Sequence, residues 1–178
     1  MLTDIERKRL RELYSLIETT NASPEEFEEY KALKAKDGEQ PCFVFGSNEA
    51  GIHGGGAAKA AREKHGAVLH QGFGPQGNSF AIPTCARPTG EKNCGISFSK
   101  VKYYVACFLL FAGAHPEREF QVTQVGCGLA GWTKDEIAPL FEDAPENCWF
   151  DTEWREFLGD SCTVNGRTFN RKYWGHIG

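Results

Sequence analysis

Two glycine-rich segments constrain the fold of this chain more than any other feature of its sequence. The first, residues 46–56, contains five glycines in eleven residues and separates an apolar segment from an alanine-rich one. The second, GCGLAG at 126–131, also follows an apolar segment. Glycine loses more backbone freedom on folding than any other residue, so both concentrations need a physical reason.

The segments that flank these glycines predict alternating strands and helices. Residues 41–46, PCFVFG, are rich in β-formers and bounded by Pro and Gly, which indicates a short buried strand. A helix is expected from Gly55 to His65, with Gly66 as its C-terminal stop. Elements of the same kinds are expected further along the chain: strands at 67–72, 79–84 and 120–126, a turn at 73–78, and helices at 101–116 and 133–145.

The two ends of the chain predict further elements. Two Ser/Thr-to-Glu pairs, at 3–6 and 23–26, have the spacing of helix capping boxes and indicate a helical hairpin. An Asn-Gly pair between β-formers at 162–170 predicts a β-hairpin. We therefore expect an α/β protein: a three-layer α/β/α domain with a mixed sheet at 37–178, preceded by a helical appendage at 1–36 and ending in the β-hairpin.

Composition and charge argue against several classes of function. The chain of 178 residues suits one domain, and its net charge of −4, with no basic run, argues against a general nucleic-acid binder. The chain has no stretch of about eighteen apolar residues, and its N-terminus is too polar for a signal peptide. We therefore expect a cytoplasmic protein that has no membrane partner.

The seven cysteines predict neither a disulfide framework nor a metal site. Their number is odd, the chain has no CxxC pair, and no histidine stands at a ligand-like spacing from them. Several lie in apolar segments, where cysteine most often packs as a small hydrophobic residue. We expect all seven to be reduced and no metal ion to be bound.

Both glycine-rich segments are expected at the carboxyl ends of strands, where ligands bind to open α/β sheets. A strand that passes through glycines into a helix aims free main-chain N–H groups, and the positive end of the helix dipole, at that edge. Two such loops on neighbouring strands could hold the two phosphates of a diphosphate. The alternative is that the glycines only serve tight turns and close helix–strand packing. Neither the P-loop ending nor the GxGxxG dinucleotide spacing is present.

A different pattern is present. A strand that ends in Asn, a GGG run that opens an alanine-rich helix, and a later strand that ends in a Gly-x-Gly loop resemble the macrodomain family. The resemblance lies in VFGSNEAGIHGGGAAKAAREKHG and VTQVGCGLAGW and covers residues 42–141. The second motif is most similar to the branch with a GCGL phosphate loop, whose members remove ADP-ribose from carboxylates, and to bacterial and phage macro-like proteins.

The resemblance implies a three-layer α/β/α domain that binds ADP-ribose or a related NAD-derived nucleotide and needs no cofactor. It also implies an ADP-ribosylated macromolecule as a second kind of partner. The ligand-binding residues that it implies are Gly46, Ser47, Asn48, Gly54, Gly55, Gly56, Gly126, Cys127, Gly128, Leu129, Ala130 and Gly131.

The chain departs from the family at the positions that serve hydrolysis. The ADP-ribose-removing branch has a lysine after the IPT-like strand and an aspartate after the GCGL motif, where this chain has Cys85 and Ala130. Another hydrolytic branch has an aspartate after the glycine run, where this chain has Ala57 and Ala58. The family's adenine-binding aspartate has only a loose counterpart in Asp37. We therefore expect a binder. The alternatives are a hydrolase that removes ADP-ribose from protein or nucleic acid, and an interaction protein that works through its N-terminal helices.

Few other residues could carry chemistry. His53 in the first loop could face a phosphate or act as an acid or base, and Asn48 could orient a water, so both are weak candidates for catalysis. Cys127 lacks the glycine two residues earlier that a nucleophile elbow requires, so we interpret it as a small side chain beside a phosphate loop. The rings that follow the second loop could stack an adenine or fill the core. They are Trp132, Trp149 and Phe150.

Overall fold

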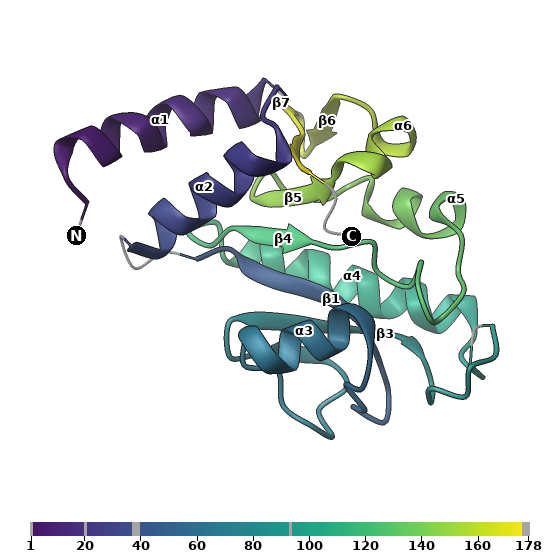
Figure 1. Ribbon diagram of the computed structural model, residues 1–178. Coiled ribbons are helices and arrows are strands. Elements are labelled where there is room, and N and C mark those ends of the chain that lie inside the picture. The colour runs from purple at the N-terminus through teal and green to yellow at the C-terminus, as the bar shows by residue number, and fades with distance from the viewer. Residues whose placement is uncertain (1, 20, 37–39, 93, 176–178) are drawn as a thin grey trace.

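The computed structural model describes residues 2–19, 21–36, 40–92 and 94–175, which contain a six-stranded mixed sheet (Figure 1). The strands in chain order are β1 (Cys42–Asn48), β2 (Gly74–Gln76), β3 (Ser79–Cys85), β4 (Phe120–Val122), β5 (Cys148–Asp151), β6 (Ser161–Val164), β7 (Arg167–Asn170) and β8 (Lys172–Trp174). The sheet has the order β2-β3-β1-β4-β5-β8, and all its neighbours are parallel except β2 and β3. β6 and β7 form a separate antiparallel hairpin.

Helices cover both faces of the sheet. They are α1 (Asp4–Glu18), α2 (Pro24–Lys36), α3 (Gly56–Lys64), α4 (Phe98–Ala114), α5 (Lys134–Ile137), η1 (Ala138–Phe141), η2 (Thr152–Trp154) and α6 (Arg155–Leu158). Side chains of β1 alternate, so that Phe43 and Phe45 pack with α3 while Val44 packs with α4. The two helices lie on opposite sides of the sheet (Figure 1). α1 and α2 cover the α3 face over β5 and β8, and α5 and η1 lie on the α4 face. The predicted α/β class and three-layer arrangement are confirmed.

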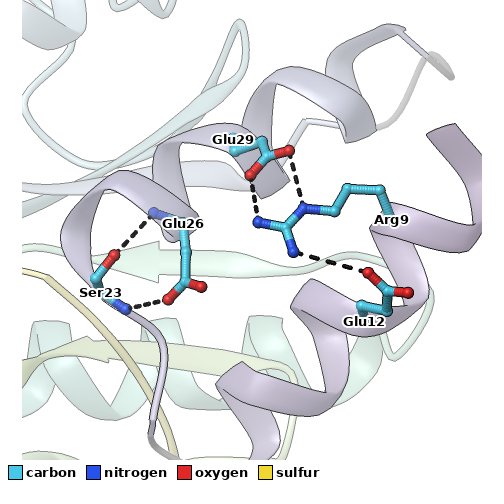
Figure 2. Close-up of polar contacts among 5 residues, drawn as sticks. All are labelled: Arg9, Glu12, Ser23, Glu26 and Glu29. Atoms are coloured by element: carbon cyan, nitrogen blue, oxygen red, sulfur yellow. Dashed lines mark hydrogen bonds and ion pairs between the residues drawn. The ribbon is translucent and has the colours of Figure 1, made fainter.

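The two N-terminal helices are tied to each other by polar contacts (Figure 2). The main-chain N–H of Ser23 donates to Glu26 at 2.8 Å, and the N–H of Glu26 donates back to Ser23 Oγ at 3.2 Å, which is the predicted capping box. The guanidinium of Arg9 on α1 donates to both carboxylate oxygens of Glu29 on α2, at 3.0 and 2.7 Å, and lies 3.7 Å from Glu12. The predicted helical hairpin is therefore present.

Aromatic rings join this hairpin to the sheet. Phe27 and Tyr30 of α2 are buried, and each ring centroid lies 5.3 Å from that of Trp149 on β5. Phe27 also stacks on Trp174 of β8, with 6.0 Å between centroids. Phe150 is buried on the opposite face of the sheet. Trp149 and Phe150 thus fill the core and are not available to stack an adenine.

The chain segment before β3 differs from prediction. Residues 67–72 form a loop and not a strand, because the N–H of Val68 donates to Gln76 Oε1 at 2.6 Å instead of joining a ladder. The short strand β2 lies inside 73–78, where a turn is expected. At the other end of the chain the predicted β-hairpin is confirmed: Asn165 and Gly166 have φ of 52° and 78°.

The C-terminal third contains the largest departures. The helix expected at 133–145 is divided into α5 and η1, because Pro139 has no N–H to continue the α-helical ladder. The sequence does not predict β5 or β8. Arg171, just before β8, is buried and donates to the carbonyl oxygens of Leu158 at 3.0 Å and Glu142 at 2.6 Å. These carbonyls end α6 and η1, where the helix dipole favours a cation.

The division of the chain into an appendage at 1–36 and a main domain at 37–178 stays a prediction. Asp37, the loose candidate for an adenine-binding aspartate, lies outside the described residues. Within the described part of the chain, no helix is both long enough and apolar enough to cross a membrane.

Packing of the helical hairpin predicts a large effect of one ring. Phe27→Ala should lower the free energy of unfolding by about 3–5 kcal/mol, because it leaves a cavity between Tyr30, Trp149 and Trp174. Urea unfolding followed by tryptophan fluorescence measures it. The control is Ile5→Ala on α1, where the side chain is 82% exposed and the change should stay within about 0.5 kcal/mol. Equal effects of the two substitutions would contradict this packing.

Candidate functional site

The order of the central strands creates a crevice at one edge of the sheet. From β1 the chain passes through α3 to β3 on one side of β1, and then through α4 to β4 on its other side. α3 follows β1 and α5 follows β4, and these two helices lie on opposite faces, so the chain leaves the ends of β1 and β4 in opposite directions. Such a topological switch point opens a crevice beyond the carboxyl ends of the strands.

A cleft of about 520 Å³ lies at this switch point. Most of the residues predicted to bind a ligand line it: Gly46, Ser47, Asn48, Gly54, Gly55, Gly56, Gly126, Gly128, Leu129 and Ala130. Residues without a prediction for binding also line it: Ile52, Ala57, Ala58, Thr84, Pro88, Thr123 and Gln124. Cys127 and Gly131 do not line it. The fold thus brings both glycine-rich loops to one cleft, and their role in binding stays a prediction.

The amino end of α3 faces the cleft with its main-chain donors uncapped. Gly55 is the N-cap residue and no side chain accepts from the first turn. The first helical bond runs from the N–H of Lys59 to Gly55 O at 3.1 Å, so the N–H groups of Gly56, Ala57 and Ala58 have no helical acceptor. Together with the positive end of the helix dipole, these N–H groups suit an anion.

The two glycine-rich loops touch each other. A Cβ on Gly46 would lie 2.9 Å from the main-chain nitrogen of Gly126, so this approach requires glycine at 46. A Cβ on Gly55 would lie 3.0 Å from the side chain of Leu129, which reaches across from the second loop. By contrast, a Cβ on Gly128 would meet nothing within 4 Å, and its φ is not in the left-handed region. Glycine at 128 therefore leaves space that the protein itself does not fill.

Polar side chains hold the first loop from behind. Asn48 donates from Nδ2 to Ile52 O at 2.8 Å, and its Oδ1 accepts from the N–H of Ile52 at 2.9 Å. Glu49 accepts from Lys100 at 2.5 Å and from the Tyr104 hydroxyl at 2.7 Å, and these bonds hold the pKa of Glu49 below its usual range. Burial, followed by the bond to Glu49, raises the pKa of Tyr104 to about 12. The loop is thereby anchored to α4.

His53 lies behind the cleft rather than in it. Its side chain is fully buried, with Nε2 3.0 Å from Ser47 Oγ and its ring edge-on to Phe45 at 5.2 Å. Burial, and secondarily the charge of Arg62, hold the pKa of His53 below its usual range. As a candidate for catalysis His53 could act only through Ser47. Asn48, the other candidate, lines the cleft but its amide is occupied by Ile52.

Side chains of the second loop support the cleft wall. Trp132 is buried and donates from Nε1 to Thr84 O at 2.8 Å, so it is not available to stack an adenine. The Cys127 thiol is half-buried, and burial raises its pKa to about 12. A thiol that stays protonated is a poor nucleophile, which agrees with its interpretation as a small side chain. Gly131 has a φ of 75° and packs against Lys92.

One expectation for the cysteines is wrong. Cys85, at the end of β3, forms a disulfide with Cys94, and their Cα atoms are 4.8 Å apart. The segment between them folds back, so that the N–H of Ala86 donates to Cys94 O at 3.1 Å and brings the two side chains together. Pro88 in this segment lines the cleft. The remaining five cysteines are free: Cys42, Cys107, Cys127, Cys148 and Cys162.

The cleft has a neutral lining. In the part of the chain that the structure describes, none of its lining residues is Lys, Arg, His, Asp or Glu. The side chains of Ala57, Ala58 and Ala130 contribute only methyl groups to the lining. Nor do three or more His, Cys, Asp or Glu residues gather within the described ranges to hold a metal ion. Charge on a ligand would meet main-chain N–H groups, the dipole of α3 and hydroxyl groups.

Comparisons of the chain with protein-family models, with curated proteins and with solved structures find no match.

The disulfide makes a countable prediction. Protein purified without reductant and unfolded in denaturant should show five reactive thiols, and seven after reduction. Cys85→Ser should show six without reductant, because Cys94 loses its partner. Titration with a chromogenic thiol reagent gives the counts. Seven reactive thiols in the unreduced wild-type protein would show that the pair does not form.

Proposed function

We propose that the cleft binds ADP-ribose or a related NAD-derived nucleotide, with the diphosphate between the two glycine-rich loops. The observation that carries the proposal is the uncapped amino end of α3, which faces the loop after β4 at a topological switch point. The resemblance of both loops to those of macrodomains agrees with it. A volume of about 520 Å³ lies in the usual range of small-molecule sites.

The neutral lining favours a bridging diphosphate over a terminal phosphate. Each phosphate of ADP-ribose carries one negative charge, whereas a terminal phosphate carries about 1.5 to 2 near pH 7. Main-chain N–H groups and a helix dipole together offer only about half a unit of positive charge. Because no cationic side chain lines the cleft within the described residues, the additional charge of ADP would lack a partner.

Binding without efficient hydrolysis fits the same lining. Cleavage of an ADP-ribosyl bond needs a nucleophile or a positioned acid or base at the ribose. The positions of the related catalytic groups hold Ala57, Ala58 and Ala130, and Cys85 is in a disulfide. The partner that we propose is therefore free ADP-ribose or an ADP-ribosylated macromolecule that is bound and left intact.

A cytoplasmic setting belongs to this proposal, since NAD-derived nucleotides are made inside cells. The Cys85–Cys94 disulfide adds a condition, because cytosolic thiols are generally kept reduced. In that compartment the pair would be a reversible one.

The first test places a charge in the cleft. Gly128→Glu should weaken ADP-ribose binding by at least about a hundredfold through bulk and like charge, while leaving stability unchanged because a Cβ meets nothing there. Isothermal titration calorimetry gives the affinity, with ADP as a second ligand that should bind more weakly than ADP-ribose. The matched control is Gly113→Glu on α4, where a Cβ also meets nothing and binding should be unaffected. Wild-type affinity in a folded Gly128→Glu protein would overturn the proposal.

A second test separates a binder from a hydrolase. ADP-ribosylated carboxylates incubated with the protein should release ADP-ribose slowly or not at all. A positioned acid or base contributes about a hundred- to ten-thousand-fold, and the described residues that line the cleft include no Lys, His, Asp or Glu. Release is followed by chromatography under multiple-turnover conditions. Rapid turnover that Asn48→Ala abolishes would show that the protein is a hydrolase with a rearranged site.

A further inference from the structure

A buried pair of side chains, Ser47 and His53, lies under the floor of the cleft. His53 Nε2 is 3.0 Å from Ser47 Oγ, and Ser47 lines the cleft. The opposite ring nitrogen, Nδ1, is buried and has no hydrogen-bond partner in the part of the chain that the structure describes. Ile52, which precedes the histidine, is clamped on both sides of its main chain by Asn48. The imidazole is therefore held in one place.

The position of the ring proton follows from this asymmetry. Burial lowers the pKa of His53, so the ring is neutral near pH 7 and carries one N–H. A proton on Nδ1 would be a buried donor with no acceptor, which is rare and costly in folded proteins. A proton on Nε2 is donated to Ser47 Oγ and leaves only an unused lone pair on Nδ1. The second arrangement is the more stable one.

With Nε2 of His53 as the donor, the Ser47 hydroxyl does not donate to the histidine and can donate elsewhere. Within the protein it donates to the carbonyl oxygen of the adjoining Asn48, at a distance of 3.3 Å. Among the other polar groups of the lining, Thr123 donates to Val44 O at 2.9 Å and Thr84 to Ser47 O at 3.4 Å. In the Nε2–H tautomer of His53, the oxygen of Ser47 accepts a hydrogen bond, and such a bond strengthens the donor on the same oxygen.

We propose that the Ser47 hydroxyl donates to a phosphate oxygen of the nucleotide bound in the cleft, and that His53 is the positioning residue that holds Ser47 in the donor orientation. The inference rests on the proposed function and gives the first loop a side-chain donor in addition to the main-chain N–H groups of α3. His53 does not touch the ligand and acts only through Ser47.

The tautomer is measured on the protein without ligand. Long-range proton–nitrogen correlation spectra of protein labelled with ¹⁵N-histidine distinguish Nε2–H from Nδ1–H imidazoles. His53→Gln identifies the signals of His53 among those of the five histidines. We expect the neutral Nε2–H form near pH 7. The Nδ1–H form would overturn the inference whether or not a nucleotide binds.

The role in binding is measured as a double-mutant cycle with ADP-ribose. Ser47→Ala should weaken affinity about ten- to a hundredfold, as expected for the loss of a hydrogen bond to a charged group. His53→Phe fills the same space without a donor and should weaken affinity about three- to tenfold, whereas His53→Gln keeps a donor near Nε2 and should restore most of it. The double variant Ser47→Ala/His53→Phe should bind no more weakly than Ser47→Ala alone.

The outcomes separate the two proposals. If wild-type protein binds ADP-ribose and Ser47→Ala binds equally well, the role of Ser47 is wrong and the proposed function stands. If the two single effects multiply in the double variant, His53 does not act through Ser47. If wild-type protein binds neither ADP-ribose nor cyclic ADP-ribose, the proposed function and the ligand role of Ser47 are both wrong. Thermal unfolding of each variant shows that the comparison is made on folded protein.

Discussion

The rest of the structure depends on the parallel pairing of β1 with β3 on one side and with β4 on the other. This pairing brings three carboxyl ends to one edge of the sheet, and it does so with α3 and α4 on opposite faces. The last residues of β1 and the loop after β4 thereby lie so close together that a Cβ on Gly46 would be 2.9 Å from the nitrogen of Gly126. A side chain at position 46 would push these two segments apart. The packing of the sheet therefore requires glycine at this position whether or not a ligand binds.

Small side chains extend the same constraint to α3. Ala58 and Ala61 of α3 pack against Phe45 of β1, and such short side chains let the helix axis lie close to the sheet. The amino end of α3 therefore lies close to the sheet, beside the carboxyl end of β1. Over β5 and β8 the same face of the sheet is covered differently, by the large rings of Phe27 and Tyr30. On this face of the sheet, α3 thus packs closely beside the cleft, and a thicker layer of aromatic rings separates α2 from β5 and β8.

Those parts of the fold that depend on local patterns could be predicted from the sequence. The buried strand at 41–46, the helix that ends before Gly66 and the hairpin at 162–170 all have distinctive periodicity or turn residues. β5 and β8 could not be predicted, because their three to four residues form strands only through pairing with distant segments. The Cys85–Cys94 pair and the contact of His53 with Ser47 depend likewise on how loops fold back, which spacing alone does not reveal. The positions of the glycine clusters predict where the cleft lies. The side-chain contacts that hold its loops could not be predicted from the sequence.

At the cleft, polar side chains hold the first loop in place, whereas main-chain N–H groups face the open space. Asn48 and Glu49 direct their polar groups away from the open space, toward the loop main chain and toward α4. Their bonds hold residues 48–52 of the first loop in place before any ligand arrives, so little conformational entropy of this segment would be lost on binding. In the proposed binding mode, affinity would come from preorganised, uncharged donors, since none of the described residues that line the cleft is Lys, Arg, His, Asp or Glu. This lining supports the proposed recognition of an anion that stays unchanged. Hydrolysis would require a proton carrier, and among the described residues at the cleft the nearest arrangement to one is Ser47 with His53 behind it.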